Sequence, residues 1–311
     1  MNTNKLVQSA LSTVLLTSVV LNMTACYIIL IKVKRKEITH LFIVSISMTN
    51  LLETTIGLTP QVLIADQSLL EKTPLCIASG FVVLGFAITN ISHLAMLSFI
   101  RTFAIKYPMP YLRFHKMFWC KVTSILVCYA NGFFWATLPL LGWSKYELDL
   151  DKKRCSLDWR LTKANSFSFI LTIFVFCNIL PGIIIALTLY LSKKAVYRRK
   201  TCKYCQNRET DILEKEYLRV CFLSAIAYFL FWTTYAIVSV LTLLKVFVPA
   251  ELTTTTALVA KLSTISNVLI NCYVIKSFRK QLLNLMLIRF IKKYLWVLIA
   301  CKKSSVNDDI N

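Results

Sequence analysis

Charged residues are scarce in this chain: Asp, Glu, Lys and Arg make up only 16% of its 311 residues, whereas 57% are hydrophobic. The scarcity is greatest in seven long apolar segments, which together contain a single acid, Glu53. A soluble domain cannot bury this much apolar surface, and apolar runs of about 20 residues are typical of helices that cross a bilayer. The seven segments cover residues 6–31, 41–65, 76–105, 119–142, 165–192, 217–244 and 252–275. The sequence therefore predicts an all-α membrane protein, a bundle of seven transmembrane helices.

Several familiar functional signatures are also missing. The chain has no internal repeat and no low-complexity tract, which argues against a duplicated transporter. It has no phosphate-binding glycine loop, no metal-binding cluster and no grouping of a nucleophile with a histidine and an acid. The three histidines, His40, His93 and His115, are scattered, and we expect them to be structural. These absences favour a single domain, residues 1–311, that acts as a receptor rather than as an enzyme.

Acidic residues are outnumbered by basic ones, 15 against 36. Of the 36 bases, 25 fall in segments on one side of the predicted bundle and nine on the other. The positive-inside rule places the N-terminus outside and the basic tail, residues 276–311, in the cytosol. That tail is also apolar, which predicts a short membrane-surface helix rather than an eighth span. The chain is thus an integral protein of the plasma membrane or an intracellular membrane, and its bases face anionic lipid or a cytosolic partner, not nucleic acid.

Cysteines are numerous, eleven in all, but only two lie on the outer side of the predicted bundle. The others lie within spans or on the cytosolic side, where thiols stay reduced. Cys76 begins the third span, and Cys155 lies in the second outer loop. Each is the only cysteine of its outer segment, so we expect a disulfide bond between them.

A lone base, Lys261, lies in the seventh span. A lysine at membrane depth is unfavourable by at least about 2.5 kcal/mol, so an intramembrane lysine indicates a function. Burial favours the uncharged amine over the ammonium form, and a neutral amine is a nucleophile toward carbonyl carbons. Lys261 therefore predicts either a covalent anchor for an aldehyde or a structural ion pair with an acid.

The spacing of these residues resembles that of the opsins, within the rhodopsin-like G-protein-coupled receptors. Opsins have a helix 3 arginine 25 residues after the disulfide cysteine, and Arg101 lies 25 residues after Cys76. Opsins also have an asparagine six residues after the lysine that carries retinal, and Asn267 lies six residues after Lys261. The resemblance implies that Lys261 carries retinal, 11-cis or all-trans, in a Schiff base. Glu214, at the base of helix 6, would then act with Arg101 in coupling to a heterotrimeric G protein.

The resemblance covers about residues 22–290 and is closest to the RGR, peropsin and retinochrome group, above all in "ALVAKLSTISN" at 257–267. The chain departs from the family at positions of the activation switch: Ile100 and Thr102 beside Arg101, Val268 and Asn271 after Asn267, Thr233 after Trp232, and Asn50 in helix 2. Three functions remain open. The chain is a light receptor with a nonstandard switch, a retinal photoisomerase that signals little, or an opsin-derived chemoreceptor without retinal.

Two acids are candidates for the counterion of a protonated Schiff base, because a buried cation needs an acidic partner. The resemblance favours Asp149 in the second outer loop, since Ser79 replaces the helix 3 acid of vertebrate visual pigments. We expect Glu53, an acid inside a span, to assist or replace Asp149 in this role. The resemblance also implies a chromophore pocket lined by Trp232, Tyr235, Gly80, Ala87, Leu157, Ala257 and Ala260.

Overall fold

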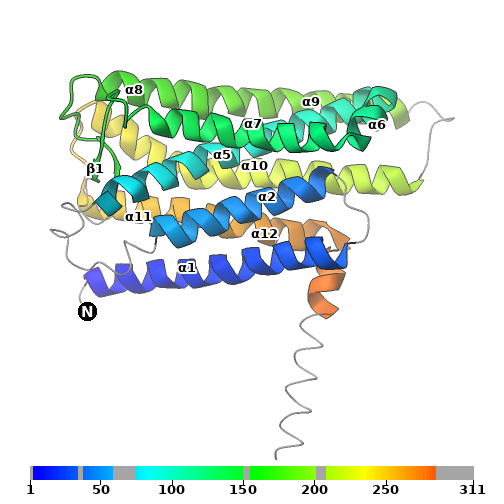
Figure 1. Ribbon diagram of the computed structural model, residues 1–311, viewed down its shortest axis with the longest axis horizontal. Coiled ribbons are helices and arrows are strands. Elements are labelled where there is room, and N and C mark those ends of the chain that lie inside the picture. Colours follow the sequence, from blue (N-terminus) through cyan, green and yellow to red (C-terminus); the bar gives the residue numbers. More distant parts are fainter. Residues whose placement is uncertain are drawn as a thin grey trace, which may run out of the picture.

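The computed structural model describes residues 3–33, 38–58, 74–149, 155–200, 208–276 and 278–284. Within these ranges, seven helical segments lie side by side with roughly parallel long axes (Figure 1). In chain order they are α1 (Thr3–Tyr27) with η1 (Ile28–Lys32), α2 (Ile38–Leu52) with η2 (Glu53–Leu58), α5 (Pro74–Lys106), α7 (Phe118–Thr137), α8 (Ser166–Ile173) with η3 (Phe174–Ile179) and α9 (Leu180–Lys200), α10 (Arg208–Leu243), and α11 (Ala250–Lys261) with α12 (Ser263–Val274). The predicted seven-helix bundle is confirmed, although the predicted second span continues beyond Leu58 into residues outside the described part.

The outer surface of the bundle suits a bilayer. Large apolar side chains such as Phe134, Leu171 and Leu230 are exposed on it, as expected where lipid replaces water. Five described helical stretches are long and apolar enough to cross a membrane: Gln8–Lys32, Pro74–Lys106, Ser166–Tyr197, Leu218–Leu243 and Glu251–Val274. Continuous backbone hydrogen bonding within each helix satisfies the polar groups that lipid cannot.

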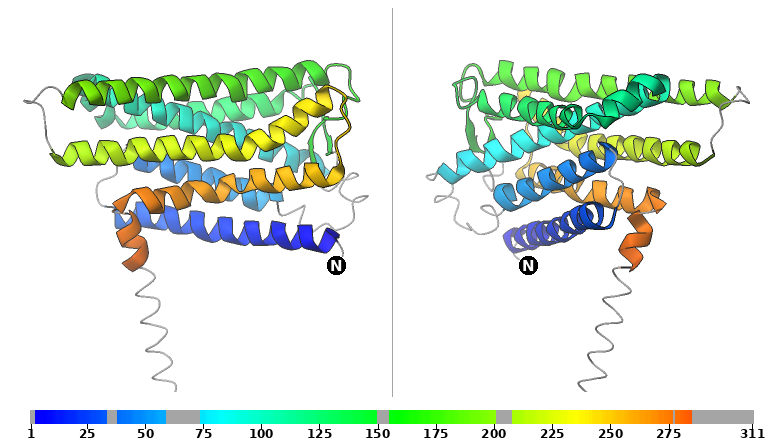
Figure 2. Two further views of the ribbon diagram at one scale, coloured as in Figure 1. Left: turned by 180° about the vertical axis from the view of Figure 1, so that it is seen from behind. Right: turned by 45° about the vertical axis from the view of Figure 1, so that its right-hand side comes forward.

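The two ends of the bundle differ. The N-terminal end of α1, the start of α11 and a small hairpin lie at one end, whereas the short helix α6 (Pro108–Lys116) lies at the other (Figures 1 and 2). Beyond α12, helical residues 278–284 turn away from the direction of the bundle (Figure 2). This turn agrees with the predicted membrane-surface helix, of which residues 285–311 lie outside the described part.

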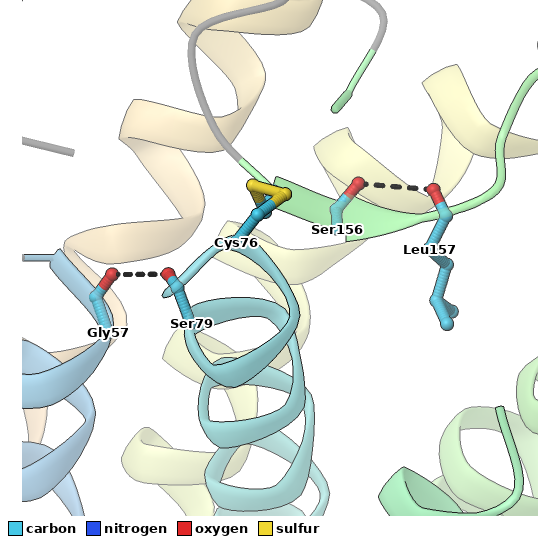
Figure 3. The surroundings of a disulfide bond; sticks show 6 residues. Gly57, Cys76, Ser79, Ser156 and Leu157 are labelled. Atoms are coloured by element: carbon cyan, nitrogen blue, oxygen red, sulfur yellow. Dashed lines mark hydrogen bonds between the residues drawn. A yellow bond between two sulfur atoms is a disulfide. The ribbon is translucent and has the colours of Figure 1, made fainter. Parts of the chain in front are cut away.

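The hairpin forms a lid over the outer end. Strand β1 (Tyr146–Leu148) pairs antiparallel with β2 (Cys155–Leu157), with Tyr146 opposite Leu157. A disulfide bond joins Cys76, near the start of α5, to Cys155 in β2, so this predicted bond is confirmed (Figure 3). Because the bond fixes β2 to α5, the hairpin is held against the helices that it covers.

The interior contains a chain of buried amides between four helices. Asn90 on α5 donates to Asn50 Oδ1 on α2 at 3.0 Å, and Asn50 donates to Asn22 Oδ1 on α1 at 3.2 Å. Asn22 and Asn50 both donate to the Thr264 carbonyl on α12, at 2.9 and 3.2 Å. Buried polar groups are stable only when paired, so this network fixes the first turn of α12 against α1 and α2.

Candidate functional site

A buried ion pair joins helix α11 to the turn η2. Lys261 Nζ lies 3.0 Å from Glu53 Oε1, and the two side chains are 8% and 1% exposed. The two residues are 208 positions apart in the chain. At this distance and burial the contact is a charge-assisted hydrogen bond between an ammonium and a carboxylate.

Backbone irregularities place both members of this pair. Lys261 is the last residue of α11, and Leu262 separates α11 from α12. At this break Ile265 donates to the Leu262 carbonyl at 3.1 Å, a tighter spacing than in an α-helix. Glu53 is the first residue of η2, a π-helical turn of a kind often found at functional sites.

A cavity of about 90 Å³ lies beside Lys261. All seven residues of the predicted pocket line it together with the lysine: Gly80, Ala87, Leu157, Trp232, Tyr235, Ala257 and Ala260. They come from α5, β2, α10 and α11, elements distant in sequence that the bundle brings together. The small residues leave room between the aromatic walls, as in other sites that enclose a large apolar ligand.

A second cavity of about 320 Å³ adjoins the first and extends between α5, α8, η3 and α10. The two share Leu84, Ala87, Leu157, Trp159, Trp232 and Tyr235 as lining residues. Its other walls include Phe167, Phe174 and Leu244, which are apolar. Together the two cavities form an apolar chamber, and Lys261 lines its first part.

The second candidate acid, Asp149, lies at the end of the hairpin and does not contact Lys261 through any described hydrogen bond or ion pair. It is buried, at 1% exposure, and Tyr235 donates its hydroxyl to Asp149 Oδ2 at 2.9 Å. Its position just after β1 ties this carboxylate to the outer lid.

Sequence reasoning missed three contributors to the site. Trp159 packs edge-on against Tyr235, with ring centroids 5.9 Å apart, and lines both cavities. Tyr228 stacks on Trp232 at 5.9 Å, and Trp232 Nε1 donates to Ser263 Oγ at 3.1 Å. The spacing of Tyr228 four residues before Trp232 on α10 is the signal that could have indicated a shared face.

The predicted switch residues lie in the half of the bundle away from the hairpin. Arg101 is buried on α5, and the neighbouring Thr102 hydroxyl donates to the Thr188 carbonyl on α9 at 2.9 Å. Asn267 lines a small inner cavity, and its carbonyl accepts a bond of 2.8 Å from Asn271 Nδ2. The side chain of Glu214 lies outside the described residues, so its contact with Arg101 stays a prediction.

The outer loop contains a well-bound carboxylate, Asp158. Burial alone would raise the pKa of Asp158, but hydrogen bonds involving Glu147, the amides of Thr162 and Lys163, and the Ser166 hydroxyl hold that pKa well below its ordinary value. Burial raises the pKa of Glu147 in the same loop. This network stiffens the segment that follows the hairpin.

A seven-helix bundle with a disulfide-bound outer lid and an apolar chamber around a buried amine defines a membrane receptor. The family described as "7 transmembrane receptor (rhodopsin family)" matches residues 21–274. The chain therefore belongs to the rhodopsin family of seven-transmembrane receptors and is an integral membrane protein.

Individual relatives show which members of this family the chain resembles. The chain is 28% identical to Opsin-3 of Mus musculus over 267 residues, which cover 82% of this chain and 64% of the relative. It is 27% identical to Pinopsin of Columba livia over 215 residues, covering 68% of this chain and 60% of that protein. The chain thus spans somewhat less than two thirds of these relatives' length. The predicted resemblance to opsins is confirmed, whereas the closer likeness to the RGR group stays a prediction.

Among solved structures, the crystal structure of squid rhodopsin superposes with a TM-score of 0.77 at 20% identity. The superposition covers 89% of this chain and 84% of the squid chain. At this identity the likeness establishes the fold.

Proposed function

We propose that this protein is an opsin-type light receptor in which Lys261 carries retinal as a Schiff base. The observation that supports the proposal most is the single amine on the wall of the apolar chamber, surrounded by all seven predicted pocket residues. The amine and the apolar, aromatic walls of the chamber fit an apolar aldehyde in their chemistry.

Bound retinal would supply an aldehyde carbon for a C=N bond to the Lys261 nitrogen, with release of one water, and a polyene whose shape changes with light. The residues of this chain do the rest. Lys261 provides the attachment atom, and Trp232 and Tyr235 wall the chamber on the α10 side. The hairpin residue Leu157 and the neighbouring Trp159 cover it toward the outer end.

A change of shape in this chamber would reach the helices through direct contacts. Trp232 is hydrogen-bonded to Ser263, two residues after Lys261, and thus couples α10 to the α11–α12 break. Movement of these helices is the means by which we expect light to reach Arg101, Glu214 and Asn267, and through them a heterotrimeric G protein.

A second candidate function is retinal photoisomerisation with little signalling. It is favoured by the α12 segment, where Val268 replaces a proline and is packed in the core while Asn271 bonds back to the Asn267 carbonyl. Without proline the helix keeps its regular hydrogen bonds and lacks the usual hinge.

The test is an absorption spectrum of the purified protein after incubation with 11-cis- or all-trans-retinal, in the dark and after light. Lys261→Ala removes the amine, and Lys245→Ala, at an exposed lysine beyond α10, is the matched control. We expect a light-sensitive visible band in the wild type and in Lys245→Ala that is absent from Lys261→Ala. Absence of a band with either isomer would contradict the proposal and leave a receptor for another ligand.

The same samples separate the two light-driven functions. Light-dependent nucleotide exchange on an added G protein supports the receptor. Preference for all-trans-retinal, release of the 11-cis isomer after light and no nucleotide exchange support the photoisomerase.

A further inference from the structure

We propose that Glu53, and not Asp149, is the counterion of the Lys261 nitrogen, both in the ligand-free protein and when that nitrogen carries retinal. The inference rests on the proposed function for its second half only. Its first half concerns the pair that the structure already contains, Lys261 Nζ and Glu53 Oε1 at 3.0 Å.

Formation of a Schiff base keeps both the Lys261 nitrogen and its positive charge. The nitrogen of the Schiff base is the lysine Nζ itself, and a protonated Schiff base carries the same single positive charge as the ammonium. Condensation of the ammonium form with an aldehyde releases water and conserves that charge. A carboxylate already placed beside Nζ can therefore remain its partner without moving across the chamber, and can hold the proton while the neutral amine reacts.

Both side chains of the pair are buried. The Glu53 side chain is 1% exposed and the Lys261 side chain 8% exposed, so water cannot stabilise either charge. A buried charge left without its partner is strongly destabilising, which makes each residue necessary to the other. Glu53 thus provides the acidic partner that the buried Lys261 cation needs.

Other polar groups near the pair are hydrogen-bonded to other partners. Asp149 is bound by the Tyr235 hydroxyl at 2.9 Å, beside the lid. Tyr228, on α10, lies within electrostatic range of Glu53, but its hydroxyl donates to the Ala87 carbonyl at 3.2 Å. Ser79 on α5 donates to the Gly57 carbonyl at 2.8 Å, as Figure 3 shows. Among the described residues, Glu53 is therefore the acid in direct contact with Lys261.

The backbone at Glu53 departs from a regular helix, which gives a reason why the sequence pattern favours Asp149 instead. Glu53 opens the π-helical turn η2, which changes the direction of the side chains after α2 relative to a regular helix. Polar contacts hold the turn in place: Thr54 bonds to Ser18 on α1 at 3.0 Å, and the Gly57 carbonyl accepts from Ser79 on α5. The position of Glu53 is thus fixed from two neighbouring helices.

The ligand-free protein provides the first test. We expect Lys261→Met and Glu53→Gln each to lower the melting temperature, and the double variant to recover most of the loss, since it leaves no unpaired charge. Glu251→Gln, at an exposed acid at the start of α11, is the control and should change nothing. Strictly additive losses in the double variant would overturn the proposal, and this result does not depend on retinal.

The retinal-bound protein provides the second test. We expect Glu53→Gln to lower the pH midpoint at which the visible band of the protonated Schiff base is lost by more than about one unit, a tenfold change in proton affinity, so that near neutral pH more of the protein absorbs at the shorter wavelength of the unprotonated form. Asp149→Asn should leave the midpoint nearly unchanged, and Glu53→Asp, which keeps the carboxylate, should retain most of the wild-type midpoint even where Glu53→Gln folds poorly. A shift in Asp149→Asn with none in Glu53→Gln would overturn the proposal. If no variant binds retinal, the proposed function fails, while the melting experiment still decides the pairing.

Discussion

The Tyr235 hydroxyl donates a hydrogen bond of 2.9 Å to Asp149 Oδ2, and this bond joins helix α10 to the hairpin that covers the chamber. The acceptor is almost completely buried, and the donor ring lines the cavity beside Lys261. The bond therefore couples the position of the outer lid to a helix that we expect to respond to light.

Tyr235→Phe removes this donor and keeps the ring. A buried carboxylate that loses a hydrogen bond is destabilised by about 1–3 kcal/mol, so we expect a lower melting temperature in detergent or nanodiscs. Tyr273→Phe, at a tyrosine that is 75% exposed, is the matched control. Equal melting temperatures for the two variants would show that the Asp149 contact does not stabilise the lid.

The disulfide bond between Cys76 and Cys155 closes a segment of 79 residues. Replacing both cysteines by serine should destabilise the protein by about 2–5 kcal/mol, because the unfolded chain gains freedom. Retinal uptake should fall as well, since β2 carries Leu157 of the chamber wall. Thermal unfolding and pigment yield measure the two effects, with Cys120→Ser, a free cysteine on α7, as control. An unchanged pigment yield in the double variant would show that retinal binding does not require the disulfide-bound hairpin.

Gly132 on α7 packs directly against the backbone of α5. A methyl group at Gly132 would overlap Thr89 Oγ1 and the Gly85 carbonyl oxygen, and the latter belongs to the backbone and cannot rotate away. We expect Gly132→Ala to destabilise the bundle by about 1–3 kcal/mol, as overpacking does.

Gly182→Ala on α9 is the comparison for this prediction. There the nearest atom is Phe229 Cζ at 3.0 Å, the tip of a side chain that can shift. Alanine also favours a helix over glycine by about 1 kcal/mol, so the stability of this variant should stay near that of the wild type. Equal melting temperatures for Gly132→Ala and Gly182→Ala would show that the close contact between α5 and α7 does not stabilise the bundle.

The helices, their orientation and the disulfide bond could be predicted from the sequence because each depends on composition along one segment. Length and apolarity define the spans, and the distribution of lysine and arginine defines the orientation. Cys76 and Cys155 are the two cysteines on the outer side, where disulfide bonds form. The residues around the chamber followed from family spacing, and the structure does place all seven together.

The partner of Lys261 could not be decided in the same way. Glu53 is separated from it by 208 residues, and their contact depends on which helices adjoin and on the π-turn that begins at Glu53. The resemblance favours Asp149 by its loop position, and the bond from Tyr235 to Asp149 depends on how α10 packs against the hairpin. Tertiary packing, which no local pattern encodes, separates the two acids.

The outer loop provides a prediction about pH. Hydrogen bonds with Glu147, the Lys163 amide, the Ser166 hydroxyl and the Thr162 amide outweigh burial and hold the pKa of Asp158 below its value in the unfolded chain. The stability that this carboxylate contributes is therefore complete above the unfolded-state pKa of about 3.9 and is lost as the pH falls toward the lower folded-state value. We expect Asp158→Asn to lower the melting temperature at pH 7 and the difference from the wild type to shrink progressively below about pH 4. Melting curves of both proteins between neutral and acidic pH, with the exposed-site variant Glu251→Gln as control, measure this difference. A difference that stays constant through the acidic range would mean that the side chain stabilises the loop by its shape rather than by its charge.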